Sequence, residues 1–233
     1  MCEDIFDRQN RLIGADATEK LKGSRVALFG LGGVGGAALE GLVRAGVGHI
    51  SLFDGDRVAP SNRNRQFLAT QQSTGKLKTV AARQRAEDIN PDVSISEFPI
   101  FYTSENSSDF DLSGYDYIID AIDMVSAKIE LILKANELNI PIISCMGTGN
   151  KLDATAFEVS DLFKTSVCPL ARVMRRELLR RGIKKLKVVY SKETPLEPIG
   201  DDKRTPASIS FVPSVAGLIL AGEVIKNLIG ENK

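Results

Sequence analysis

A glycine-rich stretch near the N-terminus has the spacing of a phosphate-binding turn. The sequence GLGGVG at residues 30–35 matches GxGxxG and lies between a short apolar run, residues 25–29, and a helical pattern, residues 34–45. Glycines allow a tight turn and let backbone N–H groups approach a phosphate at the helix N-terminus. The stretch therefore predicts a nucleotide site, without choosing the nucleotide. Its candidate binding residues are Gly30, Gly32, Gly33 and Gly35.

A carboxylate follows this turn at a distance that suits a ribose. Asp54 ends a second apolar run roughly 20 residues later, where it could accept a hydrogen bond from a ribose hydroxyl. Asp56 would lie in the loop just beyond this strand. Two alternatives stay open at this point. The turn could serve only to pack a helix on a sheet, or it could belong to an NAD-dependent dehydrogenase.

Polar motifs further along the chain separate ATP from NAD. They are SNRNRQ at residues 61–66, Lys78, and DAID at residues 120–123. Together with the glycine turn and the Asp-x-Asp at residues 54–56, they occur in the order typical of ubiquitin-activating-like adenylating enzymes, which the chain resembles. That family includes bacterial activators of sulfur-carrier proteins. An NAD oxidoreductase would leave Lys78, Arg65 and Asp123 without a clear role.

The resemblance implies a role for each of these side chains in adenylation, which joins a carboxylate to the α-phosphate of ATP and expels pyrophosphate. Arg65 and Lys78 would stabilise the charge that builds on the phosphates. Asp123 would hold Mg²⁺, a hard cation that prefers carboxylate ligands. The expected catalytic residues are Arg11, Arg65, Lys78 and Asp123, with Arg11 supplied across a homodimer. The expected ATP-binding residues are Gly30, Gly32, Gly33, Gly35, Asp54, Asp56, Asn62, Arg65, Gln66, Lys78, Asp120 and Asp123.

Within the family, the closer resemblance is to the tRNA threonylcarbamoyladenosine dehydratase branch. The similar stretches are DATEKL (16–21), YDYIIDAID (115–123), DLFKT (161–165) with Pro169-Leu170, and SKE (191–193). Sulfur-carrier activators commonly carry two CxxC pairs for zinc, and this chain has none. The branch uses ATP to activate the threonyl carboxylate of the modified adenosine at tRNA position 37. Intramolecular attack then closes a ring with net loss of water, so no enzyme nucleophile is required.

A basic segment favours an RNA partner. Eight basic side chains cluster in it, with Glu177 the only acid among them, and such a patch can track phosphates. A solvated helix face is the alternative. The candidate tRNA-binding residues are Arg172, Arg175, Arg176, Arg180, Arg181, Lys184 and Lys185, followed by Lys187.

Cys168 bears on the main alternative function. It precedes Pro169-Leu170, where relatives would be expected to carry Asp. A thioester at this cysteine would suit an adenylyltransferase for a ubiquitin-like or sulfur-carrier protein, with a sulfurtransferase as a further partner. We favour an inert Cys168, because nothing in the sequence indicates a depressed pKa. We expect Cys145 to be a core residue and His49 to have a structural role. A further alternative function is a non-catalytic nucleotide-binding scaffold.

The elements that must position these residues alternate between strands and helices. Strands are expected at 25–29, 49–53, 93–98, 115–120, 141–145 and 188–190. Helices are expected at 34–45, 76–89, from after residue 120 to about 138, 170–181 and 213–229, with a polar helical segment at 4–22 before the first strand. This alternation predicts an α/β fold with a doubly wound, mostly parallel, Rossmann-like sheet and a C-terminal extension. We expect one domain over residues 1–233, with a nucleotide-binding half, about 1–150, and a substrate-facing half, about 151–233.

Composition sets the broad class. Thirty basic residues balance thirty acidic ones, so net charge indicates no partner. The first residues are polar, which predicts no secretion signal, and no run of about 18 apolar residues predicts a membrane span. The three cysteines form neither a close pair nor an even set, which argues against disulfides and a zinc site. We therefore expect a cytoplasmic protein with no membrane association, and the family resemblance implies that it uses ATP and Mg²⁺.

Overall fold

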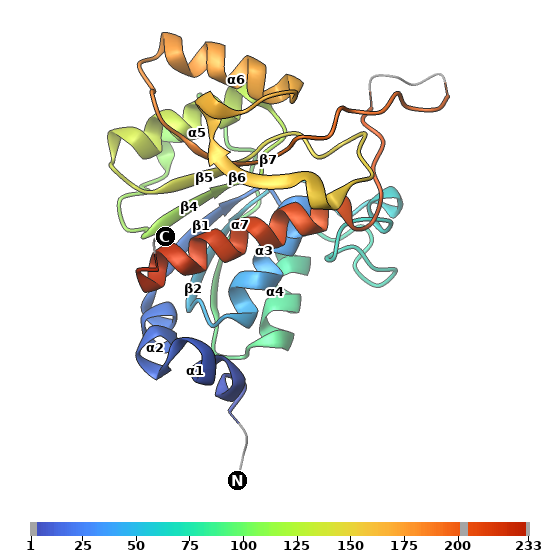
Figure 1. Ribbon diagram of the computed structural model, residues 1–233. Coiled ribbons are helices and arrows are strands. Elements are labelled where there is room, and N and C mark those ends of the chain that lie inside the picture. Colours follow the sequence, from blue (N-terminus) through green and yellow to red (C-terminus); the bar gives the residue numbers. More distant parts are fainter. Residues whose placement is uncertain (1–3, 201–204, 232–233) are drawn as a thin grey trace.

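A seven-stranded sheet with helices on both faces forms the centre of the protein (Figure 1). The computed structural model describes residues 4–200 and 205–231. The strand order is β3-β2-β1-β4-β5-β7-β6, and every neighbouring pair is parallel except β6 and β7. The strands are β1 (Arg25–Phe29), β2 (His49–Phe53), β3 (Ser94–Phe98), β4 (Tyr117–Asp120), β5 (Ile142–Cys145), β6 (Phe157–Asp161) and β7 (Lys187–Ser191).

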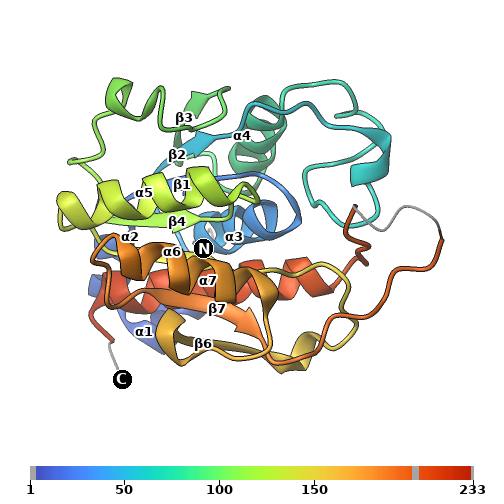
Figure 2. The ribbon, with the colours of Figure 1, turned by 90° about the horizontal axis from the view of Figure 1, so that it is seen from above.

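Two helical layers cover the sheet, with α3, α4 and α7 on one face and α5 and α6 on the other (Figures 1 and 2). The doubly wound, mostly parallel architecture expected from the sequence is thereby confirmed. The helices are α1 (Asp7–Ile13), α2 (Ala15–Gly23), α3 (Gly33–Arg44), α4 (Lys78–Ile89), α5 (Val125–Glu137), α6 (Pro169–Arg180) and α7 (Val212–Ile229), with short 3₁₀ turns at Pro60–Asn62, Ser107–Asp109, Ala154–Ala156 and Leu162–Lys164.

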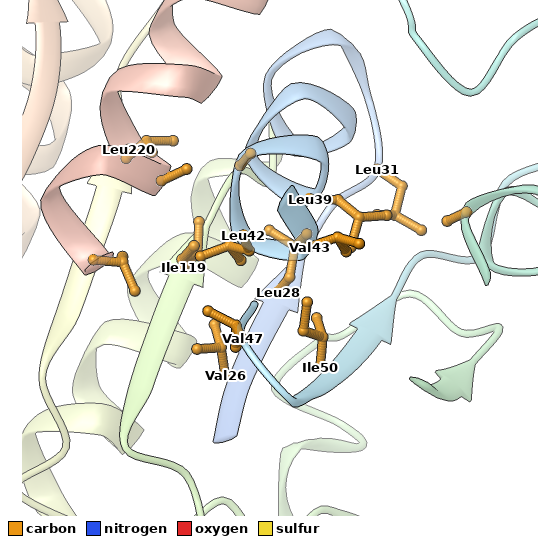
Figure 3. Close-up of a cluster of buried hydrophobic side chains, with 14 of the residues drawn as sticks. Val26, Leu28, Leu31, Leu39, Leu42, Val43, Val47, Ile50, Ile119 and Leu220 are labelled. Atoms are coloured by element: carbon orange, nitrogen blue, oxygen red, sulfur yellow. The ribbon is translucent and has the colours of Figure 1, made fainter. Parts of the chain in front are cut away.

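The strand β1 illustrates why the central strands are apolar without alternating. Val26 and Leu28 pack with Leu42 of α3 in the cluster drawn in Figure 3. Ala27 and Phe29 point to the opposite face and join a second buried cluster. Successive strand side chains alternate between faces, so a strand covered on both sides needs apolar residues throughout. The continuous apolar run at 25–29 is the signature of this double burial.

The strand order has a topological switch point between β1 and β4, at the carboxyl ends of these strands. From β1 the chain continues to β2 and β3 on one side, then crosses to β4 and β5 on the other. The loops that leave β1 and β4 therefore diverge above neighbouring strands, which is where doubly wound sheets bind ligands. The glycine turn follows β1 and the DAID motif begins at the end of β4, so the fold brings both to this switch point.

The closing helix α7 packs directly on α3 through small residues. A Cβ at Gly217 would lie 2.1 Å from the carbonyl oxygen of Val34, and one at Gly41 would lie 2.7 Å from the Cβ of Ala221. Among the described residues, α7 alone has the length and apolar composition of a membrane span, a test that the core helices of soluble proteins also pass. Its close packing on α3 is that of a core helix.

Two local features differ from the sequence expectation. The strand β6 was not expected, because FEVSD alternates only weakly and carries two acids. It forms by pairing antiparallel with β7, so the tertiary partner decides its conformation. The N-terminal helical segment is also split in two, because Gly14 adopts φ +84° between α1 and α2.

A buried carboxylate links α3 to α4 and should make stability depend on pH. Glu40 accepts hydrogen bonds from Arg44 at 2.5–2.9 Å and from Arg85 at 2.7–3.0 Å. Burial opposes its ionisation, but these arginines outweigh burial and hold the pKa of Glu40 below its ordinary 4.5. Its stabilising contribution is therefore complete above about pH 5 and is lost as the pH falls through the lowered pKa.

We expect Glu40→Gln to lower the free energy of unfolding by about 2 kcal/mol at pH 7, since charge-assisted hydrogen bonds are lost. The difference from wild type should shrink as the pH is lowered below 4.5. Denaturant unfolding at several pH values measures both effects. Glu87→Gln is the matched control, because Glu87 forms an exposed pair with Arg83 that should contribute little. An equal loss in both variants would contradict the assignment.

Candidate nucleotide site

The turn between β1 and α3 admits only glycine at two positions. Gly30 has φ +88°, and a Cβ there would lie 2.6 Å from the carbonyl oxygen of Ala121. A Cβ at Gly35 would lie 1.7 Å from the carbonyl oxygen of Gly30. Gly32 is the N-cap of α3 and offers no side-chain cap, so the first N–H groups of this helix remain open to an anion.

A carboxylate and a lysine lie beside this turn. Asp54 accepts hydrogen bonds from the backbone N–H of Leu31 at 2.6 Å and of Asp56 at 2.8 Å. Lys78, at the start of α4, is only 6% exposed, and its ammonium lies 2.7 Å from the Asp56 carboxylate and 3.8 Å from that of Asp54. The structure thus holds a desolvated positive charge next to the glycine turn, with two carboxylates keeping it in place.

The SNRNRQ segment packs against the N-terminus of α3, where a Cβ at Gly33 would lie 3.3 Å from the Arg65 carbonyl oxygen. Asn62 uses its side-chain oxygen to cap the backbone N–H of Ala59 at 2.9 Å. Arg65 is half-buried and donates to Ser61 and Asn64. Gln66 is buried, and its Oε1 has no hydrogen-bond partner within residues 4–200 and 205–231. Gln66 therefore offers an acceptor that a ligand could satisfy, whereas Asn62 has a structural task.

The two carboxylates of DAID lie in different surroundings. Asp123 is exposed, and its carboxylate has no partner among the described residues. Asp120, expected to contact the nucleotide, is instead fully buried and bonded to Lys128 and Ser144. Of these two carboxylates, Asp123 is therefore the one that is available to a ligand. Within the described part of the chain, no three His, Cys, Asp or Glu residues group as a metal cluster, so a cation here would need phosphate oxygens to complete its coordination.

Arg11 does not join the site of its own chain. The N-terminal segment packs near the carboxyl end of α3, where Gln9 donates to the Ala45 carbonyl oxygen at 2.9 Å and the Phe6 ring covers Gly46. The glycine turn opens the other end of this 12-residue helix, about 18 Å away at 1.5 Å per residue. Arg11 is exposed at this distant end.

The basic segment lies on the outer helix α6 and the turn that follows it (Figure 2). Arg175 differs from its neighbours, since it turns inward and donates to the Thr165 carbonyl oxygen at 2.9 Å. Glu177 accepts hydrogen bonds from three arginines of the segment, led by Arg181, and these hold its pKa below the ordinary value. The exposed members are Arg172, Arg176, Arg180, Arg181, Lys184 and Lys185, while Lys187 pairs with Glu223 at 3.4 Å.

The two described cysteines and His49 lie outside the nucleotide contacts. Burial raises the pKa of the Cys145 thiol to about 12, and Cys168 is 2% exposed at the start of α6. His49 is the first residue of β2, at the amino ends of the parallel strands, whereas the glycine turn lies at their carboxyl ends. Its backbone N–H donates to the Ser24 carbonyl oxygen. Cys2 lies outside the described residues.

Both buried cysteines should resist alkylation in the native protein. Iodoacetamide at pH 8 reacts with thiolates, and burial suppresses both the thiolate of Cys145 and access to Cys168. We expect peptide mapping to find both unmodified after native treatment and fully modified after unfolding in denaturant. Rapid native modification of Cys168 would instead support a thioester role.

Sequence reasoning missed two kinds of site residue. Phe101 is 58% exposed, and its ring lies against Gly55, where a Cβ would be 2.7 Å from the ring. This places an exposed aromatic ring beside the loop that carries Asp54 and Asp56. An isolated aromatic after β3 gave no spacing signal. Lys128 and Ser144 were missed because single polar residues inside apolar patterns mark no motif.

A parallel sheet whose glycine turn opens a helix beside a buried lysine and two carboxylates defines a nucleotide-binding protein of the doubly wound α/β class. The chain belongs to the ThiF family, whose model matches residues 6–233. Over 239 residues it is 41% identical to the tRNA threonylcarbamoyladenosine dehydratase of Bacillus subtilis (strain 168), with 96% of this chain and 94% of that protein covered.

Solved structures agree with this placement. The structure of E. coli tRNA N6-threonylcarbamoyladenosine dehydratase, TcdA, in complex with AMP superimposes with a TM-score of 0.91 at 30% identity, covering 99% of this chain and 98% of that one. Its complex with ATP gives a TM-score of 0.89 at 30% identity, with coverage of 97% and 94%. The likeness extends over nearly the whole fold, including the β6–β7 pair and α7.

Proposed function

We propose that the protein is an ATP-dependent tRNA threonylcarbamoyladenosine dehydratase. It adenylates the threonyl carboxylate of the modified adenosine at tRNA position 37 and promotes its cyclisation. The names of relatives that match over almost the whole chain support the substrate. The observation that carries the chemistry is the buried ammonium of Lys78, held beside the open N-terminus of α3. This arrangement would stabilise the negative charge of a triphosphate whose α-phosphate is attacked by a carboxylate.

In this proposal the chain binds the reactants and stabilises charge. The N–H groups of α3 and the ammonium of Lys78 bind the phosphates, Arg65 joins them, and Gln66 offers its free acceptor to the nucleotide. A threonyl carboxylate oxygen attacks the α-phosphorus and pyrophosphate leaves. The carbamoyl oxygen then attacks the acyl carbon, AMP leaves, and a proton is lost from the carbamoyl nitrogen. No protein nucleophile takes part, consistent with the buried Cys168.

Asp123 is the residue that would hold Mg²⁺, because its exposed carboxylate offers the hard oxygen ligand that this cation prefers. When bound, the cation neutralises charge on the leaving pyrophosphate. Asp54 shapes the turn through its two backbone hydrogen bonds and stays available to a ribose through its remaining lone pairs.

The proposal includes a cytoplasmic homodimer in which Arg11 of one subunit reaches the other subunit's ATP. The distance of Arg11 from its own glycine turn supports this arrangement, because Arg11 lies too far away to reach a nucleotide bound by its own chain. The proposal also takes residues 1–233 as one domain, supported by strands from both halves in one sheet. The exposed basic residues of α6 would track tRNA phosphates, and a sulfurtransferase is a further candidate partner.

The test is a nucleoside analysis. The purified protein is incubated with ATP, Mg²⁺ and tRNA bearing threonylcarbamoyladenosine. The tRNA is then digested, and the masses of its nucleosides are measured by mass spectrometry. Loss of one water from that nucleoside, with release of AMP and pyrophosphate, is the expected result, and reactions without ATP should leave the nucleoside unchanged. An unchanged nucleoside in a preparation that binds ATP would refute the proposal in favour of carrier-protein activation or a scaffold role.

A further inference from the structure

A lysine with no part in the proposed chemistry is completely buried beside the site. Lys128 lies one turn into α5, and neither its side chain nor that of Asp120 is exposed. Its ammonium lies 2.9 Å from the Asp120 carboxylate and donates to the Ile122 carbonyl oxygen at 3.0 Å. Two charges removed from water need good geometry and further hydrogen bonds to be tolerated. The pair therefore calls for a reason beyond filling space.

Both members of the pair also bond to the backbone of Ile122. Asp120 accepts from the Ile122 N–H at 3.2 Å through one oxygen and from the Ser144 hydroxyl at 2.5 Å through the other. The N–H and C=O of Ile122 are thus both held, one by Asp120 and the other by Lys128. Apolar side chains could fill the same volume, but they could not form hydrogen bonds with the N–H and C=O of Ile122.

The backbone of Ile122, which is held at both its N–H and its C=O, connects the glycine turn to Asp123. On one side, the Ala121 carbonyl approaches Gly30 so closely that a Cβ at Gly30 would lie 2.6 Å from its oxygen. On the other side, Asp123 follows Ile122 directly and is exposed just beyond the carboxyl end of β4. The position of Asp123 relative to the phosphate-binding turn is therefore set by the Ile122 peptide, which in turn depends on Lys128 and Asp120.

We propose that Lys128 and Asp120, supported by Ser144, are positioning residues that hold the Asp123 carboxylate at the cation site of bound ATP. The inference rests on the proposed function, because it takes Asp123 as the cation ligand. It also gives Asp120 a different task from a direct ATP contact. In this arrangement the backbone between β4 and α5 is held at Ile122, and Asp123, the next residue, presents its carboxylate from that point.

The test must separate positioning from stability. Lys128→Met alone would leave the Asp120 charge buried without a partner, and this variant should fold poorly. The double variant Asp120→Asn/Lys128→Met removes both charges, keeps an acceptor for the Ile122 N–H and should fold with a melting temperature close to that of wild type. Lys134→Met is the matched control, since Lys134 lies on the same helix and pairs near the surface with Glu137.

Calorimetry of ATP binding with and without Mg²⁺ provides the readout. We expect Mg²⁺ to tighten ATP binding in wild type and in Lys134→Met, and this gain to fall by about tenfold in the double variant, the usual cost of losing an outer-shell partner of a metal ligand. ATP affinity without Mg²⁺ should change little. A folded double variant with the wild-type gain would overturn the inference.

A cycle with Asp123→Asn tests whether the effect passes through Asp123. In wild type this change should remove most of the Mg²⁺ gain, and in the double-variant background it should cost several-fold less, because a misplaced ligand has less to lose. Equal costs in both backgrounds would refute positioning. If Mg²⁺ does not tighten ATP binding in wild type and no AMP is released with tRNA, the proposed function itself fails. This result is distinct from equal costs of Asp123→Asn in the two backgrounds, which would refute only the positioning role.

Discussion

Lys78→Ala is expected to reduce ATP-dependent dehydration of modified tRNA by at least about 100-fold, which corresponds to about 2.7 kcal/mol of lost transition-state stabilisation. The ammonium of Lys78 is desolvated and held by Asp54 and Asp56 beside the glycine turn. Its removal takes a positive charge from the phosphates and leaves two carboxylates facing them. Release of AMP under saturating ATP and tRNA measures the loss.

The control for this change is Lys76→Ala. Lys76 lies two residues earlier and is exposed, and its ammonium donates to the Gln84 side chain at 2.9 Å. We expect it to retain near wild-type activity, because a solvated charge at this distance is strongly screened. Adding Asp56→Asn to Lys78→Ala should recover part of the activity, since it removes one of the unpaired carboxylates. Full activity of Lys78→Ala would show that the phosphates bind elsewhere.

Gly35→Ala should have the second large effect, abolishing ATP binding and destabilising the fold. The added Cβ would lie 1.7 Å from the Gly30 carbonyl oxygen, a backbone atom that cannot rotate away. The turn must therefore open or α3 must shift from β1, at a cost of about 1–3 kcal/mol or more. Thermal unfolding with and without ATP measures both consequences, and the ATP-induced rise in Tm should disappear.

Gly222→Ala is the matched control for Gly35→Ala. Gly222 lies in α7, and a Cβ there would meet no atom within 4 Å. Because alanine favours a helix over glycine, we expect this variant to be as stable as wild type or slightly more stable. Its ATP-induced rise in Tm should remain. Similar behaviour of the two variants would mean that the turn is not the nucleotide site.

The sequence predicted those parts of the fold that local patterns specify. Runs such as residues 25–29 and 49–53 are apolar because both faces of the sheet are covered, and this is readable without a structure. The glycine turn was equally predictable, since its backbone requirements can be met by one residue type only. By contrast, β6 forms because of its pairing with β7, and no local pattern announces that partner.

The candidate site shows the same division. The motif placed Asp54, Lys78 and Asp123 near one switch point, but residue type alone could not distinguish exposed carboxylates from buried ones. Asp120 and Asp123 are three residues apart, yet one is fully buried and the other exposed. That difference depends on where Lys128 lies in the folded chain. Phe101 was missed for a related reason, because its contact with Gly55 joins two loops far apart in sequence.

The packing of α7 has a consequence for synthesis on the ribosome. The glycine turn leaves the ribosome early, but the atoms that support it come late: a Cβ at Gly33 would lie 3.0 Å from Pro213, and Gly217 packs on Val34. An emerging chain therefore exposes the apolar face of α3 until the last helix is made. Because Pro213 lies against Gly33 at the start of α3, the surroundings of the glycine turn are complete only after α7 has been made.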